Sequence, residues 1–309
     1  MSIGGDPVAA AVAAPISDGP AGAPAGAPAG TARLSVAWRR ARHSPSLLIG
    51  GTIVAIMVLM AILSFVWTPY NPLGIAPQIA LHGPSSAHLL GTDQYGRDVL
   101  SRLIAGARIT IYAGVVSVLI AGLIGIPAGL FAAQRGGLLD EAIMRTGDVI
   151  YGFPALLAAI TLSAALGAST TVAMIAIGIA YIPVFARVTR GSALAVLSSD
   201  FVLAARAYGR RPFAVLRRHV LPNIAAILIV QASLLFSVAI LAETALDFLG
   251  LGTPPPTASW GQMIGTAQNY LAEDPMLAVW PGIAIFLAVL GFNLLGDGLR
   301  EVLDPRLRQ

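Results

Sequence analysis

The residue types that most enzymes use for catalysis are scarce in this chain, which limits the chemistry that it can perform. It contains no cysteine, and all nineteen of its basic residues are arginine. A phosphate-binding P-loop needs a lysine, so the chain cannot form that ATP site itself. The four histidines show no metal-ligand spacing such as His-x-x-x-His; they are His43, His82, His88 and His219. We therefore expect a chain that catalyses no reaction and holds no metal or cofactor.

Two acids stand close together at the end of an uncharged apolar stretch. Glu243 and Asp247 follow the stretch 224–242 and are four residues apart, so they share one face if this part of the chain is helical. Acids at the edge of a hydrocarbon layer usually face protein or water. They could therefore line a path for a substrate and meet its amino group, or they could be structural groups at a helix end. Asn293, inside a later apolar stretch, is a third polar candidate for such a path.

The overall composition places most of the chain in a membrane. Of its 309 residues 11% are charged, whereas a soluble domain has roughly 25%. Six runs without charge each approach the roughly 20 residues that cross a bilayer as a helix. They are residues 47–67, 112–132, 149–167, 168–186, 224–242 and 277–295. We expect six transmembrane helices, because a helix satisfies its own backbone in lipid. The second run contains Gly125-x-x-x-Gly129, a motif for close helix packing.

The arginines are distributed unequally between the two predicted sides of the membrane. With the N-terminus inside, only Arg97, Arg102 and Arg108 of the nineteen lie in outer segments. Cytoplasmic loops carry the excess of positive charge, so both termini are predicted to be cytoplasmic. This topology accounts for the basic pI of about 9.8, and the chain needs no nucleic-acid partner to explain it. Residues 68–107 then form a long outer segment, and residues 187–223 form a long inner one.

The inner segment includes a stretch, Ser198–Asn223, whose sequence predicts two short helices at an angle. Residues 198–200 are Ser, Ser and Asp, any of which can cap a first helix. Gly209 can end that helix. Pro212 suits the first turn of a second helix, which we expect to stop before Pro222. On composition alone, this stretch could equally be a solvated basic loop.

The spacing within this stretch resembles the EAA loop of ABC-importer permeases. Ala204-Ala-Arg-Ala-x-Gly209 is followed, ten residues later, by His-x-Leu-Pro-Asn. In that family the loop forms coupling helices that sit in a groove of a cytoplasmic ATPase subunit, so we call Ser198–Asn223 the coupling segment. Leu203 stands where the family often has a glutamate, so docking is expected to rest on shape and apolar contact. The contact residues that the resemblance implies are Asp200, Phe201, Ala204, Ala205, Arg206, Tyr208, Gly209 and Pro212.

Three further stretches resemble the dipeptide/oligopeptide/nickel permease family, in its DppC/OppC-type branch. They are residues 88–108, 243–263 and 291–306. In the first, Thr92 or Asp93 can cap a surface helix that leads into the second run; the alternative is an extracytoplasmic gate or a docking surface for a substrate-binding protein. In the second, two glycines and three prolines stand within residues 250–256, so it should leave the helix and fold back as a loop near the outer face.

The resemblance covers about residues 45–309 and implies an all-α, polytopic membrane protein. Its MetI-like core of five helices is preceded by one N-terminal helix, giving six transmembrane helices. The expected organisation is a disordered Ala/Gly/Pro tail over 1–32, a basic segment and the first transmembrane helix over 33–68, an extracytoplasmic segment over 69–107, the five-helix core over 108–298 with the cytoplasmic coupling loop at 191–223, and a cytoplasmic tail over 299–309.

The resemblance also implies a function, namely the permease subunit of an ATP-driven importer in a bacterial cytoplasmic (inner) membrane. The implied partners are a homologous, DppB-like permease, two ATPase subunits that bind ATP and Mg²⁺, and an extracytoplasmic substrate-binding protein, and the implied mechanism is alternating access. Di- and oligopeptides are the default substrates in a family that also carries nickel chelates, glutathione and heme.

Two other classes of membrane protein remain as alternatives. An ATP-independent secondary transporter or channel usually has ionisable groups deep in the membrane, but the six runs contain no Asp, Glu, His or Arg. A membrane-embedded enzyme would need a nucleophile–base pair or a set of metal ligands near a membrane face, and the sequence shows neither.

Overall fold

The computed structural model describes Arg42 and residues 44–303. The regular structure in this part of the chain is helical, apart from one isolated β-bridge between Thr92 and Asp98. The elements are α2 (Pro45–Leu63), η1 (Pro77–Ile79), α3 (Val99–Arg135), α4 (Gly137–Tyr151), α5 (Ala155–Leu166), α6 (Thr170–Leu197), α7 (Asp200–Ala207), α8 (Pro212–Val215), the π-helical turn η2 (Leu216–Val220), α9 (Leu221–Phe248), α10 (Trp260–Ala267), η3 (Gln268–Tyr270) and α11 (Met276–Leu303). The tail predicted over 1–32 and the last residues, 304–309, lie outside the described part.

Within residues 44–303, five helices are long and apolar enough to cross a membrane, and a bent pair adds a sixth crossing if its two halves count as one. The five are α2, α3, α6, the helix from Pro212 to Phe248, and α11. The bent pair is α4 with α5. The predicted fold class, an all-α polytopic membrane protein with an extra N-terminal helix, is confirmed.

The third apolar run, 149–167, does not form the single helix that its sequence predicts. α4 ends at Tyr151 and α5 begins at Ala155, and the two helices are bent by 72° relative to each other. Pro154 is the physical reason, because it has no backbone N–H to continue the helix and its ring disfavours the helical conformation of Phe153.

Pro222 has the opposite effect. The second helix of the coupling segment was expected to stop before this residue, but it continues from Pro212 to Phe248 as one crossing of 37 residues. The turn Leu216–Val220 is π-helical, and the N–H of Leu221 bonds to the carbonyl of Leu216. Such local π adjustments allow a helix to accommodate a proline. The coupling segment is therefore continuous with the fifth apolar run.

The helix that leads into the second run begins later than predicted. Its cap is Asp98, whose Oδ2 accepts the backbone N–H of Ser101 at 2.8 Å. Thr92 and Asp93 were the expected caps, but Thr92 bonds to the backbone of the preceding loop and Asp93 accepts from Arg97. No separate surface helix forms in residues 88–108, because α3 runs without a break from Val99 into the membrane crossing.

α3 packs chiefly along α6, and two glycines of α3 permit the close approach. A Cβ atom on Gly125 would lie 2.6 Å from the Cβ of Phe185, and one on Gly129 would clash with the carbonyl oxygen of Ala186. The close packing predicted for Gly125-x-x-x-Gly129 is confirmed, and its partner is another helix of the same chain.

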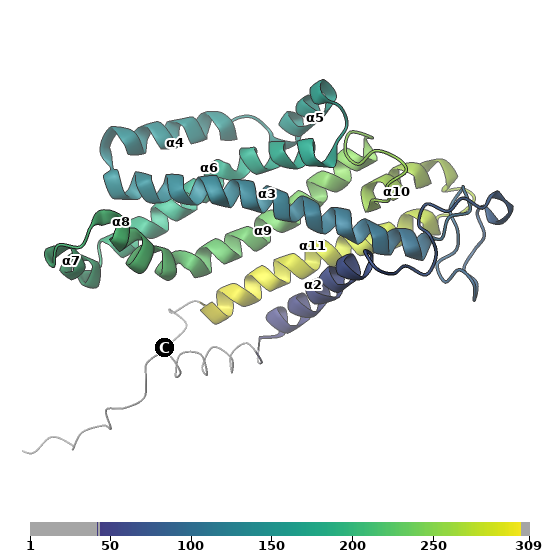
Figure 1. Ribbon diagram of the computed structural model, residues 1–309, viewed down its shortest axis with the longest axis horizontal. Coiled ribbons are helices and arrows are strands. Elements are labelled where there is room, and N and C mark those ends of the chain that lie inside the picture. The colour runs from purple at the N-terminus through teal and green to yellow at the C-terminus, as the bar shows by residue number, and fades with distance from the viewer. Residues whose placement is uncertain (1–41, 43, 304–309) are drawn as a thin grey trace, which may run out of the picture.

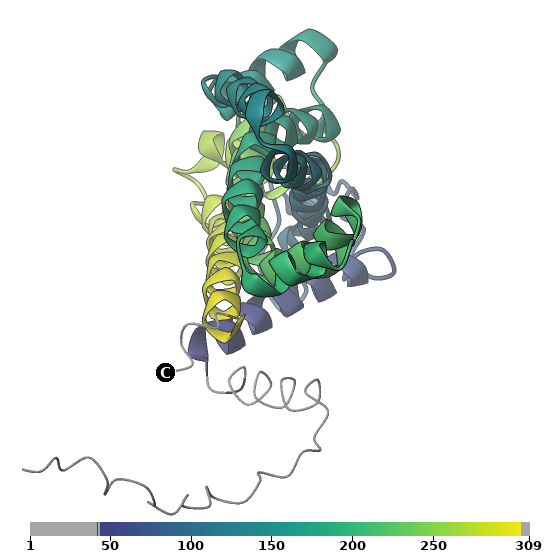
Figure 2. The same ribbon diagram turned by 90° about the vertical axis from the view of Figure 1, so that its left-hand side faces the viewer.

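The two ends and two flanks of the bundle carry different elements. α7 and α8 form one end of the long axis, and α10 and the loops around it form the other (Figure 1). Seen along that axis, α2 and α11 lie on one flank while α4 and α5 lie on the opposite one (Figure 2). α2 packs against α11 and α3, and the α4–α5 pair packs mainly against α6.

Gly129→Ala is expected to destabilise the protein, because the added methyl group would meet the backbone of α6. Overpacking of this kind costs about 1–3 kcal/mol, so the thermal unfolding midpoint of the detergent-solubilised chain should fall. Gly122→Ala, seven residues earlier in α3, is the control, because its Cβ atom would meet only ordinary contacts at 3.8 and 3.9 Å. Equal unfolding midpoints for the two variants would contradict the described packing.

Candidate functional site

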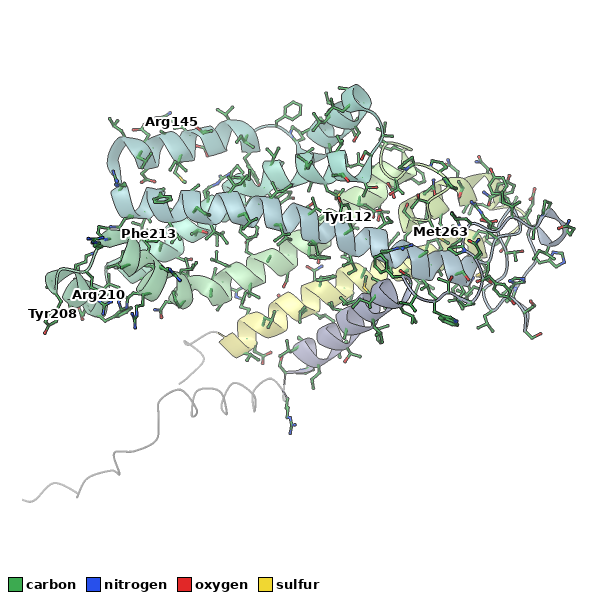
Figure 3. All side chains as sticks on the ribbon, viewed as in Figure 1. Tyr112, Arg145, Tyr208, Arg210, Phe213 and Met263 are labelled. Carbon is green, nitrogen blue, oxygen red and sulfur yellow. The ribbon has the colours of Figure 1, made fainter. Side chains whose placement is uncertain are left out.

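The coupling segment occupies one end of the molecule, where Tyr208, Arg210 and Phe213 project from the bundle (Figure 3). Gly209 terminates α7 as predicted, directly after the cap residue Tyr208, and its φ of +73° lies in the left-handed region that glycine adopts readily. The N–H of Gly209 bonds to the carbonyl of Arg206 at 2.9 Å and closes the turn. The chain therefore changes direction sharply between α7 and α8.

One side of the coupling segment is fastened to the bundle by apolar packing. Val202 of α7, Val215 of α8, and Leu216 and Val220 of the π-helical turn are all buried in one cluster. The same cluster includes side chains of α3, α6 and α9. Burial of a side chain of this size stabilises the fold by roughly 1.5–3 kcal/mol, so the segment is an integral part of the bundle.

The other side of the coupling segment is exposed and carries several large apolar side chains. Tyr208 retains 89% of its accessible surface, and Phe201 and Phe213 are at least half exposed. Of the predicted contact residues, Ala205 is half-buried, and the others are exposed: Asp200, Phe201, Ala204, Arg206, Tyr208, Gly209 and Pro212. Contiguous exposed apolar surface of this kind is typical of protein interaction sites.

A basic hollow adjoins this exposed surface. It has a volume of about 400 Å³ and is lined by Arg210, Phe213, Ala214, Arg217 and Arg218. Three guanidinium groups beside apolar side chains favour a partner whose facing surface combines acidic and apolar residues. The contact residues predicted from the sequence end at Pro212, the first residue of α8, and so they do not include Phe213, Ala214, Arg217 or Arg218.

At the other end of the bundle, Glu243 and Asp247 are buried by the chain itself. Glu243 is 1% exposed, and neither of its carboxylate oxygens has a hydrogen-bond partner among the described residues. Asp247 Oδ1 accepts the backbone N–H of Thr253 at 2.5 Å, and Gly252 and Gly261 pack closely around the Asp247 side chain. Asp247 thereby holds the predicted fold-back loop against the end of α9. This burial favours the structural alternative for the two acids over the path alternative.

Asn293 does not join these acids in one site. Gly296 of α11 packs against Ser233 of α9, and Ser237 Oγ donates to the carbonyl of Val289. Asn293 therefore lies beside a part of α9 that is about two helical turns nearer the coupling segment than Glu243 is. A translocation path lined by Glu243, Asp247 and Asn293 remains a prediction. The structure places the two acids at one depth of the bundle and Asn293 at another.

An ionic cluster fastens the segment that precedes α3 to the start of that helix. His88 Nδ1 lies 2.9 Å from Asp98 Oδ1. Asp93 accepts from Arg97 Nε at 2.6 Å, and Arg102 Nε lies 3.5 Å from the same carboxylate. One feature of the sequence indicates this cluster, namely an aspartate, Asp98, directly before the first apolar residue of the helix. Across residues 44–303, no three His, Cys, Asp or Glu side chains are grouped so that they could hold a metal ion.

Comparison with known protein families identifies the class of molecule that carries this surface. Residues 125–309 match the family of binding-protein-dependent transport system inner membrane components. This chain belongs to that family. Residues 33–85 match a second family, the N-terminal transmembrane domain of oligopeptide transport permease C, which accounts for the extra helix α2. The predicted identity as the permease subunit of an ABC importer is thereby confirmed, and members of this family work with ATPase subunits and a binding protein.

Individual relatives extend over nearly the whole permease. The chain is 39% identical to the glutathione transport system permease protein GsiD of Pectobacterium atrosepticum, over 88% of this chain and 90% of that protein. It is 37% identical to the dipeptide transport system permease protein DppC of Alkalihalophilus pseudofirmus, with the same coverage of both chains. A chain of the inward-facing MetNI methionine ABC transporter shares the fold, with a TM-score of 0.53, 18% identity and coverage of 65% of this chain and 95% of that one.

Asp247→Ala is expected to destabilise the outer loop, because it leaves the buried N–H of Thr253 without an acceptor. An unsatisfied buried donor costs about 1–3 kcal/mol, so thermal unfolding of the permease should begin at a lower temperature. Asp247→Asn keeps an acceptor oxygen and should lose less stability.

Uptake assays on Glu243→Gln and Asp247→Asn separate the structural role from the path role. The structural role predicts that the KM for every substrate stays unchanged in the variants that assemble. A KM that changes for selected substrates while the unfolding temperature stays constant would instead assign the acids to the path.

Proposed function

We propose that this permease imports short peptides, in the range from dipeptides to oligopeptides, across the bacterial cytoplasmic membrane. An extracytoplasmic binding protein delivers the peptide, and a homologous DppB-like permease completes the membrane channel. Two ATPase subunits dock on the cytoplasmic side, one on the coupling segment of each permease. Their closure on ATP moves the coupling segments, and the permease pair alternates between outward-open and inward-open states.

The observation that carries this proposal is the two-sided construction of the coupling segment. Val202 and Val215 anchor it in the bundle, while Phe201 and Tyr208 stay exposed at the tip. A loose loop could not transmit force, and a fully buried one could not dock. The uninterrupted helix from Pro212 to Phe248 then carries any displacement of the tip towards the outer loop.

The chemistry of ATP hydrolysis belongs to the partner subunits in this proposal. The chain has no lysine for a P-loop, so ATP and Mg²⁺ are assigned to the ATPases. The permease itself holds no cofactor and catalyses no reaction; its contribution is a surface that docks and a bundle that moves.

Two features support an orientation with both termini in the cytoplasm. Ser44 Oγ donates to Glu301 Oε2 at 2.6 Å, and α11 runs antiparallel to α9, so both described ends of the chain lie at the end of the bundle that carries the coupling segment. The three arginines on the proposed outer side contact other side chains of this chain: Arg97 and Arg102 pair with Asp93, and the Arg108 guanidinium stacks on the Phe65 ring at 4.6 Å.

The peptide substrate class rests on the relatives. Their names specify glutathione and dipeptides, and both are short peptides with charged amino and carboxylate groups. In this proposal the binding protein selects among such peptides, and the permease passes on whatever is delivered. An ATP-independent secondary transporter is not favoured, because the family to which the chain belongs depends on a binding protein.

Ala205→Glu and Gly209→Pro are expected to uncouple ATP hydrolysis from peptide uptake without preventing membrane insertion. A carboxylate at Ala205 would be buried without a partner in the docked interface at a cost of about 1–3 kcal/mol or more, which corresponds to roughly tenfold weaker docking or worse. Proline cannot adopt the positive φ of Gly209. The assay is uptake of a labelled dipeptide into proteoliposomes that contain the whole complex, measured together with ATPase activity.

Ala207→Glu is the matched control, because Ala207 is exposed and lies on a different face of α7 from Ala205 and Tyr208. It should transport like the parental complex. If Ala205→Glu and Gly209→Pro also transport normally, the coupling segment is only a membrane-surface anchor. If the parental complex takes up dipeptide equally well without ATP, the proposed function itself is wrong.

A further inference from the structure

The break between α4 and α5 is an exposed interruption of a membrane crossing. It comprises Tyr151, Gly152, Phe153 and Pro154, all of them exposed, with Phe153 retaining 54% of its surface. No side chain caps the start of α5, so the first N–H groups of this helix have no partner within the helix. At the end of α4, by contrast, the carbonyls of Asp148 and Ile150 accept the N–H groups of Gly152 and Phe153.

The depth of this break follows from the packing of α4 along α6. Arg190 donates to both carboxylate oxygens of Asp140, at 2.5 and 2.6 Å, near the inner end of α6. Gly147, two turns further along α4, lies against Pro183 at the middle of α6. The break begins one turn beyond Gly147, so it lies at membrane depth. Figure 1 shows the link between α4 and α5 beside the central part of the bundle.

Lipid cannot cover such a break. Non-helical backbone at membrane depth occurs only where protein buries it or where it lines a water-filled cavity, because hydrocarbon offers no hydrogen bonds. Within this chain the break stays exposed, and α4 contains no buried residue at all. The surface around the break must therefore face either water or another subunit.

An exposed pair of charges adjoins the break and points to water. Arg187 Nη1 lies 3.8 Å from Asp148 Oδ1, and the two side chains retain 43% and 67% of their accessible surface. The Arg187 guanidinium also stacks on the Tyr151 ring at 4.6 Å. Ionisable side chains in membrane proteins face the bundle interior or a water-filled cavity. A long, exposed contact of this kind is weak, so both groups keep hydrogen-bonding capacity for water or solute.

The opposite flank has the properties expected of a lipid-facing surface. α2 exposes a row of apolar side chains that includes Ile56 and Leu59, and it carries no charged residue and no break. Figure 2 shows α2 on the flank that lies away from α4 and α5. The two flanks of the crossing region therefore differ in chemistry as well as in position.

We propose that the segment Asp148–Pro154, together with Arg187, lines the water-filled path through which the peptide crosses the assembled importer. This inference rests on the proposed function, because it takes the path to run between this chain and the second permease. The exposed carboxylate and guanidinium can meet the amino and carboxylate ends of a short peptide, and Tyr151 and Phe153 can contact its side chains. The backbone at the break is hydrated by the same water.

The chain has no cysteine of its own, so single cysteines can report water access directly. Phe153→Cys and Tyr151→Cys are the test variants, and Ile56→Cys, with a matching exposure of 53% at the middle of α2, is the control. Each variant is assembled with its partner subunits in proteoliposomes. A membrane-impermeant, charged thiol reagent is added with ATP and vanadate or without nucleotide, and modification of this chain is followed by mass.

Fast modification at the break is the expected result. The reactive form of a thiol is the thiolate, which apolar surroundings suppress, so Phe153→Cys and Tyr151→Cys should react at least about tenfold faster than Ile56→Cys. Their rates should also differ between the nucleotide conditions, and peptide-loaded binding protein should slow them. Because two positions report on the same surface, a variant that fails to assemble leaves the other to decide.

Two results would overturn this inference. In one, both break cysteines react as slowly as Ile56→Cys in every condition. In the other, they are unreactive in the complex but cross-link to the second permease, which would make the break a subunit interface. Peptide uptake by the parental complex is measured separately. Uptake that does not depend on ATP would count against the proposed function. Slow labelling of the break cysteines in a complex whose uptake is ATP-driven would count only against the path.

Discussion

The structure depends on one uninterrupted helix, Pro212–Phe248, that joins the coupling segment at one end of the bundle to the outer loop at the other. Its continuity past Pro222 rests on the π-helical turn Leu216–Val220, whose two terminal side chains, Leu216 and Val220, are buried among side chains of α3 and α6. Because helices are stiff over this length, a displacement at the tip must reach the loop held by Asp247. α9 contacts α3, α6, α10 and α11, so the displacement also reaches the rest of the core.

Each surface of the bundle carries a feature that suits one environment. The coupling segment exposes aromatic side chains and arginines, which suit a protein partner, and α2 exposes uncharged apolar side chains, which suit lipid. The α4–α5 flank presents a broken helix and an exposed ion pair, which suit water. At the end of the bundle opposite the coupling segment, Glu243 and Asp247 are buried, and Asp247 holds the loop after α9. Permeases need all of these surfaces at once, because they must dock, sit in lipid and enclose an aqueous path.

Local sequence patterns predicted the five long crossings, the end of α7 just before Gly209 and the fold-back loop, because each depends on hydropathy or on one residue's backbone preference. They failed at prolines, whose effect depends on distant contacts. Pro154 breaks its helix where nothing encloses it, whereas Pro222 lies beside a π turn supported by buried neighbours. Asp98 caps α3 because Thr92 and Asp93 bind other groups: Thr92 bonds to the backbone of Ile79 and His82, and Asp93 pairs with Arg97 and Arg102. A single sequence shows none of these partners, and for the same reason it could not show that Glu243 is buried.

The most direct test of this account is the reactivity of one cysteine at the tip of the coupling segment. In Tyr208→Cys the new thiol is the only one in the chain, at a position that is 89% exposed in the isolated permease. The rate of modification by a water-soluble thiol reagent is measured for the isolated chain and for the complex with its ATPase subunits. The account predicts rapid modification of the isolated chain, strong protection in the complex and cross-linking of this position to an ATPase. Equal rates in both samples, without a cross-link, would contradict it.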